Sequence, residues 1–246
     1  MSRNFLSEDE MYDAVSEGLT EEQELTDYEY SIMGRVSTGL AVLEGNFSHD
    51  VLQDVYRTGG MYGVLIERVD DVVDSDHGSE TVDDIQDFLG REVDVLRTGE
   101  RPESYSPVEE ASFIAAEEVN NLLEGEAQEE FADRMQVLAD VVIEEESKDE
   151  CYEEHLESAD VMFGNAAYLL DASTEYTPDE GLWRKTGRLL QITDDRVDRD
   201  RDRTDRQMHE RQQRLLEEIT GEHGRRIGWP VKASEKLIRE VGKRSV

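Results

Sequence analysis

Apolar residues recur every three or four positions along most of this chain, which is the period of an amphipathic α-helix. The first such segment begins near Tyr28 and stops near Gly45, with apolar positions at Ile32, Val36, Leu40 and Leu43. No segment alternates polar and apolar residues in the manner of a strand. The pattern therefore predicts an all-α protein.

Further helices are predicted over 48–74, 82–96, 107–123, 126–145, 147–171, 178–200 and 207–220. Ser48 is a suitable N-cap, and Pro107 and Pro178 stand where helices favour proline, at their starts. The pair Gly59-Gly60 suggests a kink in the second helix, and the turn-rich stretch 98–107 suggests a loop. A chain of this length suits one helical domain.

Three regions differ in character. Residues 1–27 form an acidic and weakly patterned N-terminal extension, 28–223 form the helical domain, and 224–246 form a basic C-terminal tail. The tail clusters arginine and lysine around Trp229, so we expect it to meet an acidic partner surface or to close over phosphates.

The charge of the chain changes how its acidic residues are interpreted. There are 61 acidic and 26 basic residues, for a net charge of −35. A bias spread through every segment resembles the proteins of salt-in halophiles, in which a Debye length of roughly 3 Å at molar salt screens the repulsion. Such a chain repels nucleic acid. Most of its acidic residues are then interpreted as solvated surface.

The chain also carries signs of its compartment. Cys151 is the only cysteine, so no internal disulfide can form, which fits a reducing cytosol. The N-terminus lacks a signal-peptide pattern, and no apolar run approaches the roughly 20 residues that span a bilayer. We therefore expect a cytoplasmic protein without a transmembrane segment.

Two aspartate clusters are the candidate chemistry. Each reads D-D-x-x-D on a predicted helix, the first with Asp70, Asp71 and Asp74, the second with Asp194, Asp195 and Asp198. The first and last aspartates of each cluster lie four residues apart and so share a helix face. Two such helices facing each other would supply the carboxylate oxygens that Mg²⁺ binds together with phosphate. A third copy begins at Asp83, which shows that so acidic a chain can also form the pattern by chance.

The context of both clusters carries a resemblance. The second lies in Gly187-x-x-x-Gln191-x-Thr193-Asp194-Asp195-x-x-Asp198, which resembles the second aspartate-rich motif of the class I isoprenoid synthases. The first follows Tyr62 and Arg68, an arrangement similar to the first motif of squalene and phytoene synthases. Asp70 and Asp194 are 124 residues apart, about the separation in that fold.

The resemblance implies a single orthogonal helical bundle of the isoprenoid synthase type, with an active cavity between the two motif helices. It implies that Asp70, Asp74, Asp194 and Asp198 act catalytically through bound Mg²⁺, with Asp71 and Asp195 as further metal ligands. Tyr62, Arg68 and Gln191 would contact a prenyl diphosphate, whose allylic C–O bond breaks before a second prenyl chain is joined. Peripheral membrane contact for a lipid product and a homodimer are left open.

The chain departs from the family in ways that support a second reading. The second motif carries Asp194 and Val197 where squalene and phytoene synthases have asparagine and arginine, which is closer to the chain-elongating polyprenyl diphosphate synthases. The basic motifs of those enzymes are missing: Ser75-Asp76-His77-Gly78 follows the first cluster, where they have paired arginines. The alternative is a catalytically inactive helical paralogue that acts as a binding or regulatory partner.

Overall fold

The computed structural model of the chain describes residues 27–45, 47–73, 82–146 and 152–199, together with Arg214 and Glu217. Within these ranges the chain forms seven α-helices and no strand, which confirms the all-α prediction for this part of the protein. The helices are α2 (Asp27–Glu44), α3 (His49–Val73), α4 (Val82–Thr98), α5 (Pro107–Asn120), α6 (Glu126–Glu146), α7 (Tyr152–Ser173) and α8 (Glu180–Arg199). The acidic extension 1–26, the helix predicted over 207–220 and the basic tail lie outside the described residues, apart from those two residues.

The observed helix bounds follow the apolar pattern closely, and the largest differences have a local cause. The helix predicted over 107–123 was extended to Leu123, but α5 ends at Asn120 and a turn follows. Leu123 is nonetheless buried, so its place in the apolar pattern reflects burial in a turn. At the other end, Ser106 and Glu109 form a reciprocal capping box and Pro107 opens the helix as predicted.

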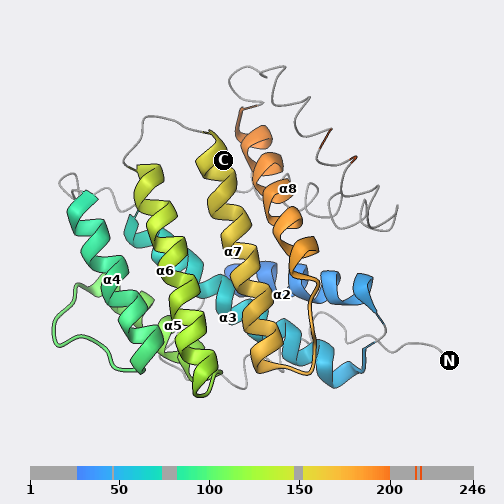
Figure 1. Ribbon diagram of the computed structural model, residues 1–246, viewed down its shortest axis with the longest axis horizontal. Coiled ribbons are helices and arrows are strands. Elements are labelled where there is room, and N and C mark those ends of the chain that lie inside the picture. The colour runs from blue at the N-terminus through green and yellow to red at the C-terminus, as the bar shows by residue number, and fades with distance from the viewer. Residues whose placement is uncertain are drawn as a thin grey trace.

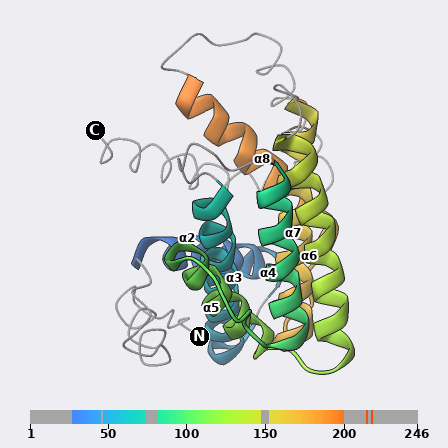
Figure 2. The same ribbon diagram turned by 90° about the vertical axis from the view of Figure 1, so that its left-hand side faces the viewer.

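The helices lie in two layers. Figure 1 shows α4, α6, α7 and α8 side by side, with α2 and α3 crossing behind them. Figure 2 shows α4, α6 and α7 in one layer and α2, α3 and α5 in the other. Neighbours in contact include α2 with α3, α3 with α5 and α7, α4 with α6, and α7 with α8. The core between the layers contains Tyr62, Phe113, Phe131, Leu169 and Trp183, all fully buried.

The crossing of α2 and α3 depends on glycine. A Cβ on Gly59 would lie 2.2 Å from Ser37 Oγ, and one on Gly34 would lie 2.9 Å from the ring and the carbonyl oxygen of Tyr56. These contacts require backbones without side chains at the crossing. Helix α3 runs unbroken through Gly59-Gly60, and Gly59 serves close packing against α2.

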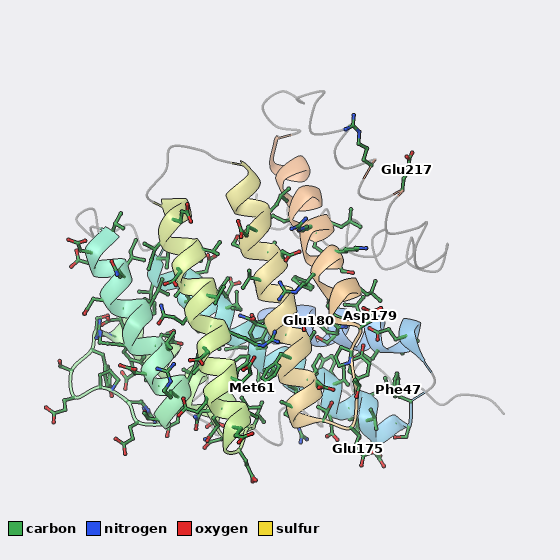
Figure 3. All side chains as sticks on the ribbon, viewed as in Figure 1. Phe47, Met61, Glu175, Asp179, Glu180 and Glu217 are labelled. Carbon is green, nitrogen blue, oxygen red and sulfur yellow. The ribbon has the colours of Figure 1, made fainter. Side chains whose placement is uncertain are left out.

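The connection between α7 and α8 is fixed to the end of α2. The Glu44 carboxylate accepts hydrogen bonds from Tyr176 Oη at 2.7 Å, the Asp179 backbone N–H at 2.8 Å and Trp183 Nε1 at 3.1 Å. The Phe47 ring meets the Tyr176 ring edge to face at 5.1 Å. Figure 3 shows Phe47, Glu175 and Asp179 near this connection. The start of α8 is thereby held in a defined place.

Candidate functional site

The first aspartate cluster lies at the C-terminal end of α3. Asp70 and Asp71 are both exposed, whereas Val72 between them and the helix end is 5% exposed and packs into the core. Asp74 lies outside the described residues. The two described aspartates thus lie on the outward face of the last turns, where solvent reaches them.

Arg68 is engaged within the same helix. Its Nη1 donates to Asp71 Oδ2 at 2.7 Å, an ion pair between residues three apart. Exposed pairs of this kind contribute little to stability, about 0.3–0.5 kcal/mol. The pair also holds a guanidinium next to a carboxylate that the sequence assigned to a metal. Contact of Arg68 with diphosphate remains a prediction.

Tyr62 is a core residue in this structure. Its side chain is fully buried, and its hydroxyl donates a hydrogen bond to the Met162 carbonyl oxygen of α7 at 2.8 Å. Burial raises the pKa of Tyr62 well above its usual 10.0, so the phenol stays protonated. The Tyr62 ring also meets Phe131 of α6 edge to face at 6.3 Å. These contacts explain Tyr62 as a packing residue, and its contact with substrate remains a prediction.

The second cluster lies on α8, as its sequence pattern predicted. The helix continues through the motif to Arg199, and Gln191 is partly buried one turn before Asp194. The side chains of Asp194, Asp195 and Asp198 lie outside the described part of the structure. Their contribution to a metal site therefore rests on the sequence and on the course of the helix.

Helix α8 approaches α7 through a glycine. A Cβ on Gly187 would lie 2.5 Å from the Ala159 carbonyl oxygen and 2.6 Å from the Phe163 ring. Gly164 of α7 lies under the Arg184 guanidinium, with a hypothetical Cβ 2.6 Å from Cζ. The two helices therefore cross at a separation that a side chain at Gly187 would increase, whereas one at Gly164 would displace the Arg184 guanidinium.

Asp160 ties the same two helices together by charge. Its Oδ2 accepts from Arg184 Nη1 at 2.9 Å, and its Oδ1 lies 2.8 Å from Arg188 Nε. The Asp160 side chain is 18% exposed, so this pairing is better shielded than a typical surface ion pair. Arg184 also pairs with Glu180, which Arg134 of α6 reaches at 3.3 Å. Burial alone would raise the pKa of Glu180, but the two arginines outweigh it and lower that pKa.

Glu92 of α4 is a second acidic residue that composition alone would have placed on the surface. Its side chain is 2% exposed. Within the described part of the chain, its carboxylate oxygens and the nearby Ser112 Oγ form no hydrogen bond of good geometry. Burial raises the pKa of Glu92 from 4.5 to about 8, and proximity to Ser112 lowers it slightly. The sequence contained a signal for this burial, because Glu92 lies four residues after Phe88 and four before Leu96, on the apolar face of its helix.

The two aspartate clusters are related through α7. Both motif helices contact it. In Figure 1 α8 ends at the top of the molecule, whereas α3 crosses behind α6 toward the left. In Figure 2 the upper end of α8 leans over the layer that contains α3. Where side chains are described, no three histidine, cysteine, aspartate or glutamate residues come together as a metal site. Asp74 and the three aspartates of α8 are not among those described side chains, so this finding does not concern them.

Two further findings bear on function. Among the described helices, none combines the length and the apolar character needed to cross a membrane. Comparison of the chain with protein families, curated proteins and solved structures found no match.

Proposed function

We propose that this protein is a Mg²⁺-dependent prenyltransferase of the isoprenoid synthase type, which ionises an allylic diphosphate and joins prenyl chains as squalene and phytoene synthases do. The proposal assigns the site to the C-terminal ends of α3 and α8. Asp70, Asp71 and Asp74 would line one side, and Asp194, Asp195 and Asp198 the other.

One structural observation carries the proposal. The turn Ala159–Phe163 of α7 contacts both motif helices: Met162 accepts the Tyr62 hydrogen bond from α3, and Asp160 pairs with Arg184 and Arg188 of α8. Asp70 lies eight residues beyond Tyr62, and Asp194 lies six beyond Arg188. At 1.5 Å per residue, each cluster begins roughly 9–12 Å along its own helix from a residue that contacts this turn. Support of both motif helices by one turn of α7 favours two halves of one site.

The donor set suits the metal. Asp70 and Asp71 are exposed carboxylates, so a cation can reach them without opening the core. Carboxylate oxygens are the ligands that Mg²⁺ takes in proteins that bind phosphates. Asp71 would exchange its pairing with Arg68 for the cation, which would leave the guanidinium to bind a phosphate oxygen as a bidentate donor. Bound there, Mg²⁺ would stabilise the negative charge of the leaving diphosphate.

Other side chains near the ends of α3 and α8 would bind the substrate and exclude water. Gln191, partly buried one turn before Asp194, is suited to hydrogen-bond the substrate or a water molecule. Leu65 and Val72 of α3 and Leu189 of α8 are buried below the clusters. Apolar packing there excludes water from the carbon skeleton, as a carbocation intermediate requires.

Turnover tests the proposal directly. The purified full chain is incubated with farnesyl or geranylgeranyl diphosphate and Mg²⁺ in molar KCl, and released diphosphate and lipid products are measured. Turnover that Asp70→Ala and Asp194→Ala each reduce at least about a hundredfold supports the proposal. Asp83→Ala, in the exposed third copy of the motif on α4, is the matched control and should leave turnover unchanged.

The second candidate is a non-catalytic helical protein that binds a partner. It is favoured by the engagement of Tyr62 with Met162 and of Arg68 with Asp71, since both residues already serve the fold. Absence of turnover, with Mg²⁺ and diphosphate binding the same in wild type and in the Asp70 and Asp194 variants, would establish this candidate in place of the enzyme.

A further inference from the structure

Asp160 is the one carboxylate in the described residues that receives guanidinium groups from two successive turns of α8. Arg184 and Arg188 are four residues apart, so they lie on the same side of α8 one turn from each other. Together they enclose the Asp160 carboxylate along the helix axis. A shift of α8 along α7 by one turn, 5.4 Å, would break at least one of the two pairs.

Steric contacts at the same place restrict the other directions. Gly187 lies between the two arginines in sequence and meets the Ala159 carbonyl oxygen and the Phe163 ring, so α8 cannot approach more closely. The Arg184 guanidinium covers Gly164, where any side chain would displace it. The position of α8 on α7 is therefore specified by two charge pairs and two glycine contacts within less than two turns of each helix.

The same turn of α7 also fixes α3. Met162, two residues after Asp160, accepts the hydrogen bond from Tyr62. A shift of α8 on α7 would therefore change the position of α8 relative to α3. The separation of the two aspartate clusters depends on that position.

We propose that Asp160 is a positioning residue for the metal-diphosphate site: by holding Arg184 and Arg188 it sets the register of α8 and so the placement of Asp194 and Asp198 relative to Asp70. This inference rests on the proposed function. Asp160 itself stays paired within the fold and contacts neither the metal nor the substrate. Its role resembles that of outer residues that orient metal ligands, whose replacement typically costs 10–100-fold in metal affinity.

Binding of Mg²⁺ with inorganic diphosphate, measured by calorimetry in molar KCl, tests the inference without requiring turnover. Asp160→Asn keeps the size of the side chain and removes its charge. Its affinity is expected to fall about tenfold or more. The EPR spectrum of Mn²⁺ used in place of Mg²⁺ should also change, since it reports the arrangement of the ligands. Arg188→Gln, which removes one of the two pairs, should shift both measurements in the same direction and serves if Asp160→Asn does not fold.

Asp133→Asn is the matched control. Asp133 of α6 forms an ion pair with Arg97 at 2.7 Å, away from α7 and α8, so its loss should leave diphosphate binding unchanged. Wild-type affinity and an unaltered Mn²⁺ spectrum in Asp160→Asn or Arg188→Gln would overturn the positioning role alone, even if the unfolding temperature fell. A wild-type chain that binds no Mg²⁺ and diphosphate would overturn the proposed function and this inference together.

Discussion

The carboxylate of Glu44, at the end of α2, accepts a hydrogen bond at 3.1 Å from the indole Nε1 of Trp183, 139 residues later in the chain. Trp183 is fully buried in α8, so its N–H has no access to water. The same carboxylate accepts from Tyr176 Oη and from the Asp179 backbone. Two donors from the α7–α8 connection and one from α8 thus share one acceptor from a distant helix.

Replacement of Glu44 by alanine should therefore be costly. Two buried donors would lose a charged acceptor, and we expect the free energy of unfolding to fall by about 3 kcal/mol. Urea denaturation in molar KCl measures it. Glu175→Ala, an exposed residue of the same connection, should change it by less than about 0.5 kcal/mol. Equal effects of the two substitutions would contradict the assigned role of Glu44.

Removal of the Tyr62 hydroxyl should have a smaller effect. Tyr62→Phe keeps the ring in its contact with Phe131 and loses the bond to the Met162 carbonyl oxygen. We expect a loss of about 1 kcal/mol in the free energy of unfolding, the usual net contribution of such a bond. The denaturation midpoint reports the change. An unaltered midpoint would show that this bond contributes nothing to the attachment of α3 to α7.

Glu92 should make stability depend on pH. Its pKa is about 8 in the folded state and near 4.5 when the chain is unfolded, so the folded state retains a proton that the unfolded state releases. The stability that this proton contributes is fully present below pH 4.5 and is lost as pH rises to 8. Within that window the free energy of unfolding should fall by about 1 kcal/mol per pH unit from this group.

Glu92→Gln isolates that contribution, because glutamine has the same shape and does not titrate. Urea denaturation of both proteins at pH 5, 7 and 9 should show a widening advantage for the variant as pH rises. Curves for wild type and variant that stay parallel across this range would mean that Glu92 ionises without penalty in the folded protein.

The glycine at the crossing of α7 and α8 predicts a contrast between two equivalent substitutions. Gly187→Ala places a Cβ against the Ala159 carbonyl oxygen and the Phe163 ring, and we expect a destabilisation of about 2 kcal/mol. Gly90→Ala on α4 meets nothing within 4 Å and should stabilise by about 0.5–1 kcal/mol through its higher helix propensity. Thermal unfolding of both variants measures the difference in sign, and a shared sign would contradict the close crossing.

The helices were predictable because their apolar residues keep the period of the helix from Asp27 to Arg199, and seven of them end within a few residues of the predicted positions. The turn after Asn120 was not, because Leu123 is buried without being helical. Periodicity records which side chains face the core. It does not distinguish a last helical turn from a buried loop.

The acidic residues show where the sequence stops being informative. In a chain with 61 aspartates and glutamates, solvation is a sound expectation for each, and Asp70 and Asp71 are indeed exposed. Glu44 and Asp160 are exceptions to this expectation. Their hydrogen-bond donors Trp183 and Arg184 lie later in the chain and contact them only in the folded state. The family resemblance of the two aspartate motifs remains a prediction.

Gly164 should restrict which substitutions this protein can accept during evolution. The Arg184 guanidinium, which pairs with Asp160, lies where a Cβ at position 164 would be, so any other residue there would require Arg184 to shift. Substitutions at positions 160, 164 and 184 should therefore occur together among descendants of a common ancestor. Where Asp160 and Arg184 persist, glycine should persist at 164, and where the pair is lost, larger residues should become admissible there.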